Sequence, residues 1–358
     1  MQLSRNFSLQ ELIKSDTAIR LDINNNPNSL YMSPTDPEEI EKIKTTMKSK
    51  TSRGIDDINS EFIKKIKQNI KVPLSKLINM SLETGKIPAS LKIAKVIPIF
   101  KNKSPEEYTN YRPISLLPIM SKILEKVVHK RLYNFMNLQT CNQLYNNQYG
   151  FRTKHSTIHA ITQLSAEILE SFDNNNFTLG VFLDLSKAFD TINHSTLLKK
   201  LEHYGIRGVA LEWFRNYLLD RKQYVHFNGI NSNQQYVTCG VPQGSVLGPL
   251  LFIIYTNDLP NAKRSSRCIL FADDTTIYYS SNNLNNLISK ITSDLEHLTD
   301  WFSANKLSLN VITTNVILFS NDTRNIADKT IKLSLSNMNI NRVSETKFLG
   351  ILIDDKLT

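Results

Sequence analysis

Residues 268–279 read CILFADDTTIYY, in which two short β-prone runs flank the acidic pair Asp273–Asp274. This spacing predicts a tight hairpin with the two aspartates in its turn. Adjacent carboxylates repel each other, so such a turn is destabilised unless a cation lies beside it. Hard divalent cations such as Mg²⁺ take carboxylate oxygens and substrate phosphates as ligands, which makes the pair a candidate metal site. A solvated turn without a metal is the alternative.

A third aspartate, Asp184, ends the apolar run at residues 179–183. Alone, a carboxylate at a strand end is usually a surface residue or a helix cap. Together with the hairpin, three carboxylates from two neighbouring strands would suit two cations about 3.5–4 Å apart, the separation that clamps the attacking and leaving oxygens in phosphoryl transfer. We therefore take Asp184, Asp273 and Asp274 as candidate metal ligands.

The composition indicates a basic, folded protein. The chain has 358 residues, enough for one large domain or two ordinary ones, with 41% hydrophobic and 21% charged residues. These values predict a sizeable core and exclude wholesale disorder. The net charge of +10 attracts polyanions, of which nucleic acid is the commonest, although a basic protein without such a partner has the same charge.

Targeting and cysteine patterns favour an intracellular protein. The cysteines Cys141, Cys239 and Cys268 are odd in number and far apart, which fits a reducing compartment and predicts no disulfide framework. No signal peptide is visible, and the longest apolar stretch, residues 246–255, is too short to cross a bilayer. We expect a soluble protein of the nucleus or cytoplasm with no membrane partner.

Periodicity predicts a mixture of helices and strands. The expected helices cover residues 38–47, 55–70, 121–136, 195–204, 211–219 and 284–302. The expected strands cover residues 95–100, 179–183, 236–238, 268–271, 275–279 and 316–319. Because the two kinds of element do not alternate regularly, an α+β fold is favoured.

Two further features lie near the acids in the sequence. The loop GVPQGS at residues 240–245 would let a ligand approach the main chain closely, although an ordinary turn before a helix near Leu250 is the simpler reading. Phe189 follows Asp184 by five residues. Its ring would lie beneath the sugar of a nucleotide bound at Asp184 and clash with a 2′-hydroxyl, or it would simply belong to the core.

Some cationic residues are candidates for phosphate or metal contacts. Lys101 and Arg112 lie in an extended region punctuated by prolines, where each would contact a triphosphate or a template backbone, or remain a solvated surface cation. His155 and His159 have a spacing that binds zinc on a helix, but no acidic or cysteine residue lies beside them. We therefore expect no zinc site.

Three stretches follow one another along the chain: VFLDLSKAFD at residues 181–190, GVPQGS at 240–245 and FADD at 271–274. In this order they closely resemble the three palm motifs of reverse transcriptases. The residues in these motifs are typical of non-LTR retrotransposons of the jockey and related LINE-like groups. The resemblance covers roughly residues 54–358.

The flanking stretches agree with this resemblance. NYRPISLL at residues 110–117 resembles the fingers motif, and QYGFR at 148–152 with HST at 155–157 resembles the segment that follows it. FLGI at residues 348–351 resembles the hairpin that grips the primer. Each piece alone is short, and their combination is what makes the resemblance specific.

The resemblance implies a right-hand polymerase fold of fingers and palm, with an antiparallel palm sheet flanked by helices. It divides the chain into a linker or arm at residues 1–50, a helical extension of the fingers at 51–79 and a reverse transcriptase domain at 80–358. The thumb is expected to be absent or truncated, because the chain stops at Thr358, just after the hairpin that resembles a primer grip.

The implied activity is RNA-directed DNA synthesis from a 3′-hydroxyl primer. The implied partners are an RNA template, a DNA primer or target and deoxynucleoside triphosphates, while the oligomeric state stays open. By position in the motifs, Asp184 and Asp273 would be the principal ligands of two Mg²⁺ ions and Asp274 the third acid. These ions would activate the primer hydroxyl and stabilise the leaving pyrophosphate.

The resemblance also implies roles around the incoming nucleotide. Phe189 would be the steric gate that selects deoxynucleotides. Gln243 and Gly244 would lie against the template and the nascent base pair. Arg112 would lie near the phosphates of the nucleotide, and Lys101 completes the predicted nucleotide-binding set.

The chain departs from the family pattern in two ways. Family members usually carry Lys-Thr where this chain has Thr313-Thr314, and a lysine there is thought to help protonate the pyrophosphate, so turnover is expected to be slower. No apurinic-type endonuclease precedes the polymerase, so we expect a fragment of a larger reading frame or a partly decayed copy. The alternatives to an active polymerase are a catalytically silent nucleic-acid-binding remnant and a maturase-like RNA-binding protein.

Overall fold

The computed structural model describes residues 26–66, 70–101, 104–137, 143–321, 331, 333–335 and 338–358. Cys141 and residues 1–25 of the predicted arm lie outside the described residues. The chain divides into two compact units. The described part of unit 1 falls within Leu144–Ala188 and Thr256–Thr358, and that of unit 2 within Ile23–Gln143 and Phe189–Tyr255.

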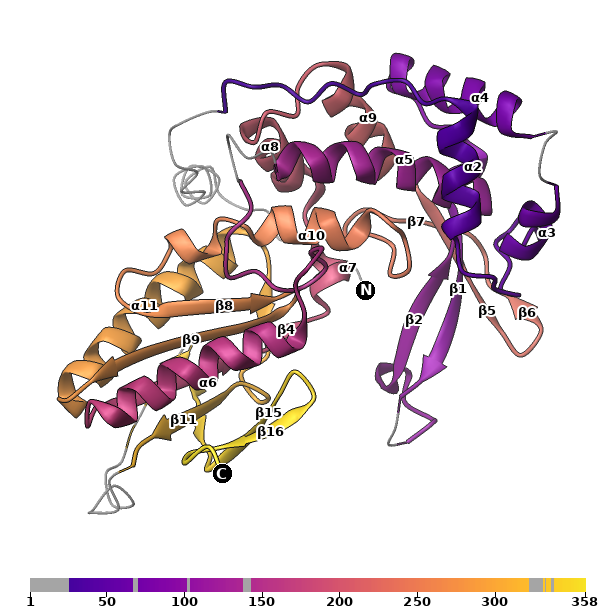
Figure 1. Ribbon diagram of the computed structural model, residues 1–358. Helices are drawn as coiled ribbons and strands as arrows, with labels where there is room; N and C mark the ends of the chain where they lie inside the picture. The colour runs from indigo at the N-terminus through magenta and orange to yellow at the C-terminus, as the bar shows by residue number, and fades with distance from the viewer. Residues whose placement is uncertain are drawn as a thin grey trace, which may run out of the picture. The chain divides into compact units, whose positions relative to one another are not determined.

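Unit 1 is built on a sheet with the strand order β14-β11-β3-β9-β8 (Figure 1). Its strands are β3 (Phe177–Leu183), β8 (Arg267–Phe271), β9 (Asp274–Ser281), β11 (Asn315–Phe319) and β14 (Asn341–Arg342). All neighbours are antiparallel except β11 and β14. The predicted antiparallel sheet is therefore mixed, because the long connection from β11 lets β14 return in the same direction.

Two helices, α6 (Thr157–Asp173) and α11 (Leu284–Ala304), pack on this sheet and cover its opposite faces (Figure 1). The buried side of α6 repeats every four residues, as expected of an amphipathic helix, and consists of Ala160, Leu164, Ile168 and Phe172. These side chains share one hydrophobic cluster with Phe182 of β3. Part of the core of unit 1 therefore lies between α6 and the sheet whose strand β3 ends just before Asp184.

Shorter strands complete unit 1. They are β4 (Leu185–Ser186), β10 (Ser308–Leu309), β12 (Ser334–Leu335), β13 (Met338–Asn339), β15 (Glu345–Phe348) and β16 (Ile351–Asp354), and η3 (Leu259–Asn261) is a 3₁₀ turn. The hairpin predicted at residues 348–351 is confirmed as β15–β16. Its turn residues, Leu349 and Gly350, both have positive φ, at 49° and 98°, as a two-residue turn of a twisted hairpin requires.

Unit 2 carries a second mixed sheet, with the order β2-β1-β5-β6 and β7 also paired to β5. Its strands are β1 (Ile93–Phe100), β2 (Tyr111–Leu116), β5 (Lys222–Phe227), β6 (Ile230–Asn231) and β7 (Gln235–Tyr236). The helices lying wholly or mostly in unit 2 are α2 (Pro37–Thr46), α3 (Ser60–Lys65), α4 (Lys71–Thr84), α5 (Ile119–Met136), α7 (Ala188–Thr191), α8 (His194–His203), α9 (Val209–Leu218), α10 (Gly248–Thr256) and the 3₁₀ turns η1 (Ala89–Lys92) and η2 (Tyr108–Asn110).

Most predicted elements are confirmed with small shifts at their ends, but the helix predicted at residues 55–70 is shorter. Only Ser60–Lys65 form α3, because the side chain of Asn59 accepts a hydrogen bond from the backbone N–H of Phe62 and starts the helix there. Phe62 is 53% exposed, whereas Ile63 is buried, so the predicted apolar stripe does not face the core. The strand predicted at 236–238 is likewise reduced to β7.

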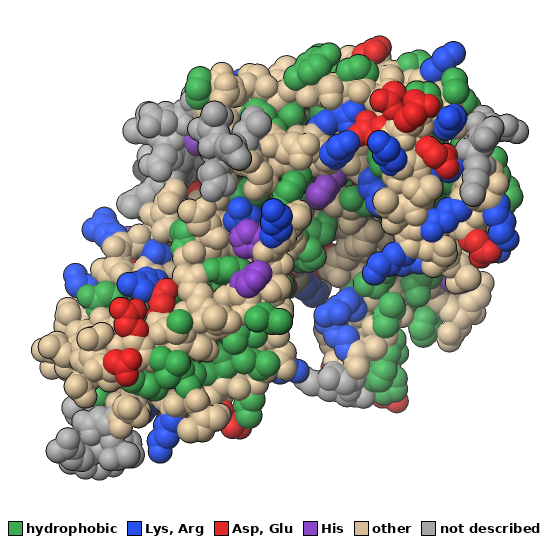
Figure 2. Space-filling view, viewed as in Figure 1, with side chains coloured by type: hydrophobic (Ala, Val, Ile, Leu, Met, Phe, Trp, Pro, Cys, Tyr) green, Lys and Arg blue, Asp and Glu red, His purple; other side chains and the backbone are tan. Residues whose placement is uncertain are grey.

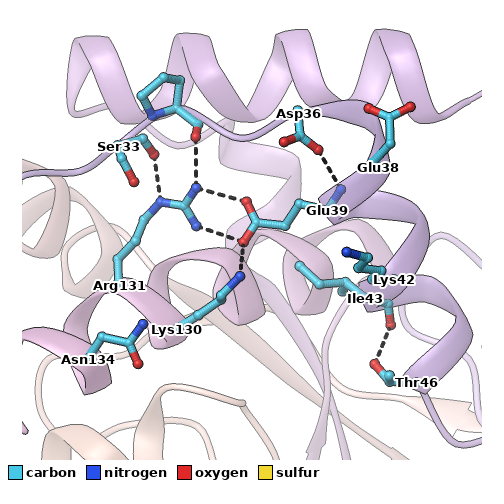
Figure 3. Close-up of a pocket in the computed structure, with 11 residues that line it drawn as sticks. Ser33, Asp36, Glu38, Glu39, Lys42, Ile43, Thr46, Lys130, Arg131 and Asn134 are labelled. Atoms are coloured by element: carbon cyan, nitrogen blue, oxygen red, sulfur yellow. Dashed lines mark hydrogen bonds and ion pairs between the residues drawn. The ribbon is translucent and has the colours of Figure 1, made fainter.

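The segment before α2 is clamped onto α5 by one arginine (Figure 3). The guanidinium of Arg131 donates to both carboxylate oxygens of Glu39, at 2.9 and 3.3 Å, and to the backbone oxygens of Ser33 and Pro34. Lys130 donates to Glu39 as well, at 2.9 Å. These polar groups line a cavity of about 560 Å³. Because they bond one another, we interpret the set of side chains as a structural clamp. Residues 37–46 of the predicted arm thus form an anchored helix.

Candidate active site

The three predicted acids gather at one end of the unit 1 sheet. The last paired residues of β3 and β9 are Leu183 and Thr275, so Asp184 and Asp274 come next on neighbouring strands. Asp274 is itself paired with Phe271 of β8, which leaves Ala272 and Asp273 as the turn. The predicted hairpin is confirmed, and it places Asp273 and Asp274 at the same edge as Asp184.

The charges of these acids act on one another. The pKa of Asp274 is raised from 3.8 to about 6, first because protein atoms crowd its carboxyl and then because of the negative charges of Asp273 and Asp184. Part of the residue nevertheless remains accessible to water. Among the described residues, no group of three or more His, Cys, Asp or Glu side chains is gathered closely enough to hold a metal ion as it stands. The edge therefore gathers the negative charges of three carboxylates.

Asp184 is held by the segment at residues 308–314, in which Thr313-Thr314 replaces the usual Lys-Thr. Strand β10 pairs with β4 directly after Asp184, and the backbone N–H of Asn310 donates to the Asp184 backbone oxygen at 2.8 Å. The hydroxyl of Thr313 donates to Oδ2 of Asp184 at 2.6 Å, and Nδ2 of Asn310 donates to the same oxygen at 3.3 Å. The residue in place of the usual lysine thus contacts a predicted metal ligand.

The acidic turn is held from its other side by Gln148, which sequence reasoning missed. The segment around Gln148 runs parallel beside Leu270 of β8, and its Oε1 accepts from the backbone N–H groups of Gly150 and Ala272, at 2.8 and 3.1 Å. Gln148 is 1% exposed. A Cβ on Gly150 would lie 2.4 Å from the Ala272 nitrogen, so only glycine allows this approach. The available signal was the stretch QYGFR.

The turn needs such support because its first residue is strained. Ala272 has a φ of 57°, in the left-handed region that residues with a side chain rarely adopt. Strained backbone of this kind costs about 1–3 kcal/mol and persists only where neighbouring contacts impose it. The hydrogen bond from Ala272 to Gln148 is one such contact.

In unit 2, the stretches at residues 110–117 and 240–245 contact each other. The backbone N–H of Ser115, in β2, donates to the backbone oxygen of Gln243 at 2.7 Å. Gly244 has a φ of 116°, and a Cβ there would lie 2.8 Å from the Ser115 oxygen. The side-chain amide of Gln243 donates to both carboxylate oxygens of Asp190, at 2.8 and 2.9 Å. Asp190 was not predicted to have a role.

Phe189 packs partly into the core of unit 2. Its ring stacks on the fully buried ring of Phe252, with 4.7 Å between centroids, while Phe189 itself is only half-buried. Its backbone oxygen accepts from Val241 at 2.8 Å, and a Cβ on Gly240 would lie 2.6 Å from the Asp190 oxygen. Helix α7 and the 240–245 loop are therefore packed backbone to backbone, and the gate remains a prediction.

A buried carboxylate supports the end of the same loop. Glu125 of α5 accepts from the backbone N–H of Val246 at 2.6 Å and from the hydroxyl of Tyr217 at 3.2 Å. Burial raises the pKa of Glu125, while the nearby positive charge of Arg221 and these hydrogen bonds act in the opposite direction. The sequence offered no signal for this contact, since Glu125 lies on the otherwise apolar side of its helix.

The two predicted cations are exposed in unit 2. Arg112 lies opposite Ile99 in the β1–β2 pair, and the backbone N–H of Lys101 donates to Asn110 at 2.9 Å. Within the described part of the chain neither side chain forms an ion pair, so both can meet an anion. Figure 2 shows further Lys and Arg side chains on the visible face of each unit, in keeping with the net charge of +10.

A family model described as reverse transcriptase (RNA-dependent DNA polymerase) matches residues 99–353. The chain is 32% identical over 344 residues to the probable RNA-directed DNA polymerase from transposon BS of Drosophila melanogaster, covering 92% of this chain and 37% of that protein. It is 28% identical over 338 residues to the RNA-directed DNA polymerase from mobile element jockey of the same species, covering 92% and 36%.

A third relative, the probable RNA-directed DNA polymerase from transposon X-element of Drosophila melanogaster, is 27% identical over 332 residues, covering 91% of this chain and 36% of that protein. The chain thus spans little more than a third of the length of these curated relatives. The resemblance to the jockey group is confirmed. Because the family model covers more than half of its residues, the chain belongs to the reverse transcriptase (RNA-dependent DNA polymerase) family.

Proposed function

We propose that this chain is the RNA-directed DNA polymerase of a non-LTR retrotransposon, copying an RNA template into DNA from a 3′-hydroxyl primer. The observation that carries the proposal is the meeting of Asp184 with the Asp273–Asp274 turn at the ends of β3 and β9. Burial and the mutual repulsion of the acids together raise the pKa of Asp274, and a bound cation would relieve the repulsion. Family membership supplies the chemical context.

The reverse transcriptase family is generally dependent on divalent metal ions. We assign Asp184 and Asp273 as the principal ligands of two Mg²⁺ ions and Asp274 as the third acid, since carboxylate oxygens suit that ion. Among the described residues, no group of three acids could hold an ion as it stands, so we propose that ion binding shifts these side chains. When bound, the ions would activate the primer hydroxyl and stabilise the leaving pyrophosphate.

The remaining predicted residues receive their roles from the same proposal. Phe189 selects deoxynucleotides, held in place by its stacking on Phe252. Gln243 and Gly244 contact the template and the nascent base pair, and Arg112 contacts nucleotide phosphates together with Lys101, as exposed cations suit. An RNA template, a DNA primer or target and deoxynucleoside triphosphates are the partners.

We extend the proposal to the polymerase fold. The unit 1 sheet is assigned to the palm, and β1 and β2 to the fingers, within a polymerase domain at residues 80–358 that follows an arm at 1–50 and a helical extension at 51–79. Among the described residues, no helix is both long and apolar enough to span a bilayer. Nucleus or cytoplasm is the proposed site of action.

Primer extension on an RNA template with Mg²⁺ tests the assignment. We expect Asp273→Asn to reduce synthesis at least about 100-fold, because a principal ligand of the catalytic ions is lost. Template affinity should stay the same, because cations that contact phosphate supply most of it. Asp300→Asn, an exposed aspartate of α11, is the matched control and should be fully active. Equal synthesis by Asp273→Asn and the unchanged protein would refute the metal assignment.

A second candidate is a catalytically impaired remnant that still binds nucleic acid. It is favoured by Thr313, which stands where the family usually has lysine. Such a protein would show no extension with any divalent ion, yet would bind RNA with an affinity that falls steeply with salt.

A further inference from the structure

The turn Asn310–Thr314 wraps around Asp184 in unit 1. The backbone N–H of Thr314 bonds to the oxygen of Asn310 at 3.1 Å, closing a single helical turn, and the buried Thr314 hydroxyl donates to the same oxygen at 2.9 Å. Asn310 is in turn tied to the Asp184 backbone. Thr313 is thus held in position although its side chain is exposed.

We propose that Thr313 is a positioning residue whose hydroxyl orients the Asp184 carboxylate for a divalent cation. The inference rests on the proposed function, because it assumes that Asp184 is a metal ligand. It assigns a role to the residue that replaces the usual lysine.

The hydrogen bond has the geometry of a strong contact. A threonine hydroxyl has one proton to donate. The Thr313 hydroxyl oxygen lies 2.6 Å from Oδ2 of Asp184 but 3.3 Å from the backbone oxygen of Asn310. The shorter contact is to the charged oxygen, and hydroxyl–carboxylate bonds of this length are among the stronger ones. The proton therefore goes to Asp184.

Both side-chain donors use the same oxygen. Thr313 and the Asn310 amide meet Oδ2, so Oδ1 is the oxygen that a cation would take first. Two neutral donors also offset the repulsion that Asp273 and Asp274 exert on Asp184, without adding a positive charge that would compete with a metal ion. Partners of this kind fix the orientation of a metal ligand and typically change metal affinity about 10–100-fold.

The test compares Thr313→Val, which keeps the shape and removes the hydroxyl, with Thr313→Ser, which keeps the hydroxyl. Mn²⁺ affinity of the whole chain is measured by calorimetry, and the Mg²⁺ dependence of primer extension is measured separately. We expect Thr313→Val to weaken Mn²⁺ binding about tenfold and to raise the half-saturating Mg²⁺ by a similar factor. Thr313→Ser should stay within about twofold, and primer–template affinity should not change.

Thr45→Val controls for removing an exposed threonine hydroxyl, since Thr45 bonds only to its own helix α2. If the unchanged protein extends primers in an Asp184-dependent manner but Thr313→Val matches it in Mn²⁺ affinity, the inference is wrong and the proposed function stands. If Asp184→Asn changes neither Mn²⁺ binding nor extension, both are overturned.

Discussion

Glu39 and Glu125 in unit 2 are surrounded differently from the acidic turn of unit 1. In unit 2, Glu39 is met by Arg131 and Lys130, and Glu125 by backbone N–H groups and Tyr217. In unit 1, the pKa of Asp274 is raised by burial and then by the negative charges of two further aspartates. The pKa of Glu39 falls to about 2, while that of Asp274 rises to about 6.

This difference distinguishes acids that stabilise the fold from acids that we propose bind metal ions. A carboxylate with its own donors within the chain lowers the free energy of the folded state. Carboxylates that crowd one another raise it, and such an arrangement persists where something outside the chain compensates for it. Removing one group from each class tests this difference.

Removing Arg131 should have the largest effect. Arg131→Ala leaves Glu39 and the backbone oxygens of Ser33 and Pro34 without their guanidinium, so we expect the free energy of unfolding to fall by about 2–3 kcal/mol at pH 7. Denaturant unfolding measures it. Arg215→Ala is the matched control, because its pair with Glu212 is exposed and should contribute less than about 0.5 kcal/mol.

The same clamp predicts a pH dependence. Burial alone would raise the pKa of Glu39, but hydrogen bonds from Arg131, Thr35 and Lys130 outweigh it and lower the pKa from 4.5 to about 2. The stabilisation is therefore present above pH 4.5 and is lost as the pH falls from 4.5 towards 2. Arg131→Ala should lose less stability over this range, and equal losses in both proteins would contradict the role of the clamp.

The next effect concerns the support of the acidic turn. Gln148→Leu removes the oxygen that holds Ala272, so the strained turn should shift and turnover in primer extension should fall about tenfold, with unchanged primer–template affinity. Gln163→Leu is the matched control, since Gln163 bonds to Tyr149 and Glu167 but not to the turn. If the two variants lose stability and turnover in the same proportion, Gln148 has no specific role at the acids.

Periodicity was enough to predict most elements, because the buried residues of a helix or strand recur at a regular spacing that is visible in the sequence. The helix at 121–136 is an example, because the apolar residues that repeat along one of its faces are all buried: Ile123, Leu124, Val127, Val128, Leu132 and Phe135. The helix at 55–70 failed because one capping residue, Asn59, outweighed a weak apolar stripe. The pairing of β14 with β11 depends on a contact across many residues, which no local pattern encodes.

The candidate site also has parts that the sequence predicted and parts that it did not. The placement of Asp184 beside the acidic hairpin followed from motif order and is confirmed by the strand register. The partners that hold these acids were missed, because Gln148 and Thr313 are distant in sequence and ordinary in kind. Hydrogen bonds between distant side chains and backbone follow from tertiary structure, so only the structure identifies them.

The smallest expected effect is on the free energy of unfolding, which should change in opposite directions in two aspartate-to-asparagine variants. Asp274→Asn removes one of three repelling charges, so we expect the free energy of unfolding without divalent ions to rise by about 1 kcal/mol at pH 7. Asp190→Asn should instead lower it by about 1 kcal/mol, because the Asp190 carboxylate accepts twice from Gln243. Added Mg²⁺ should stabilise the unchanged protein more than Asp274→Asn, since only the former keeps all three carboxylates. If both substitutions destabilise equally, the acids of unit 1 are as well satisfied as those of unit 2, and the physical case for a cation between Asp184 and the turn fails.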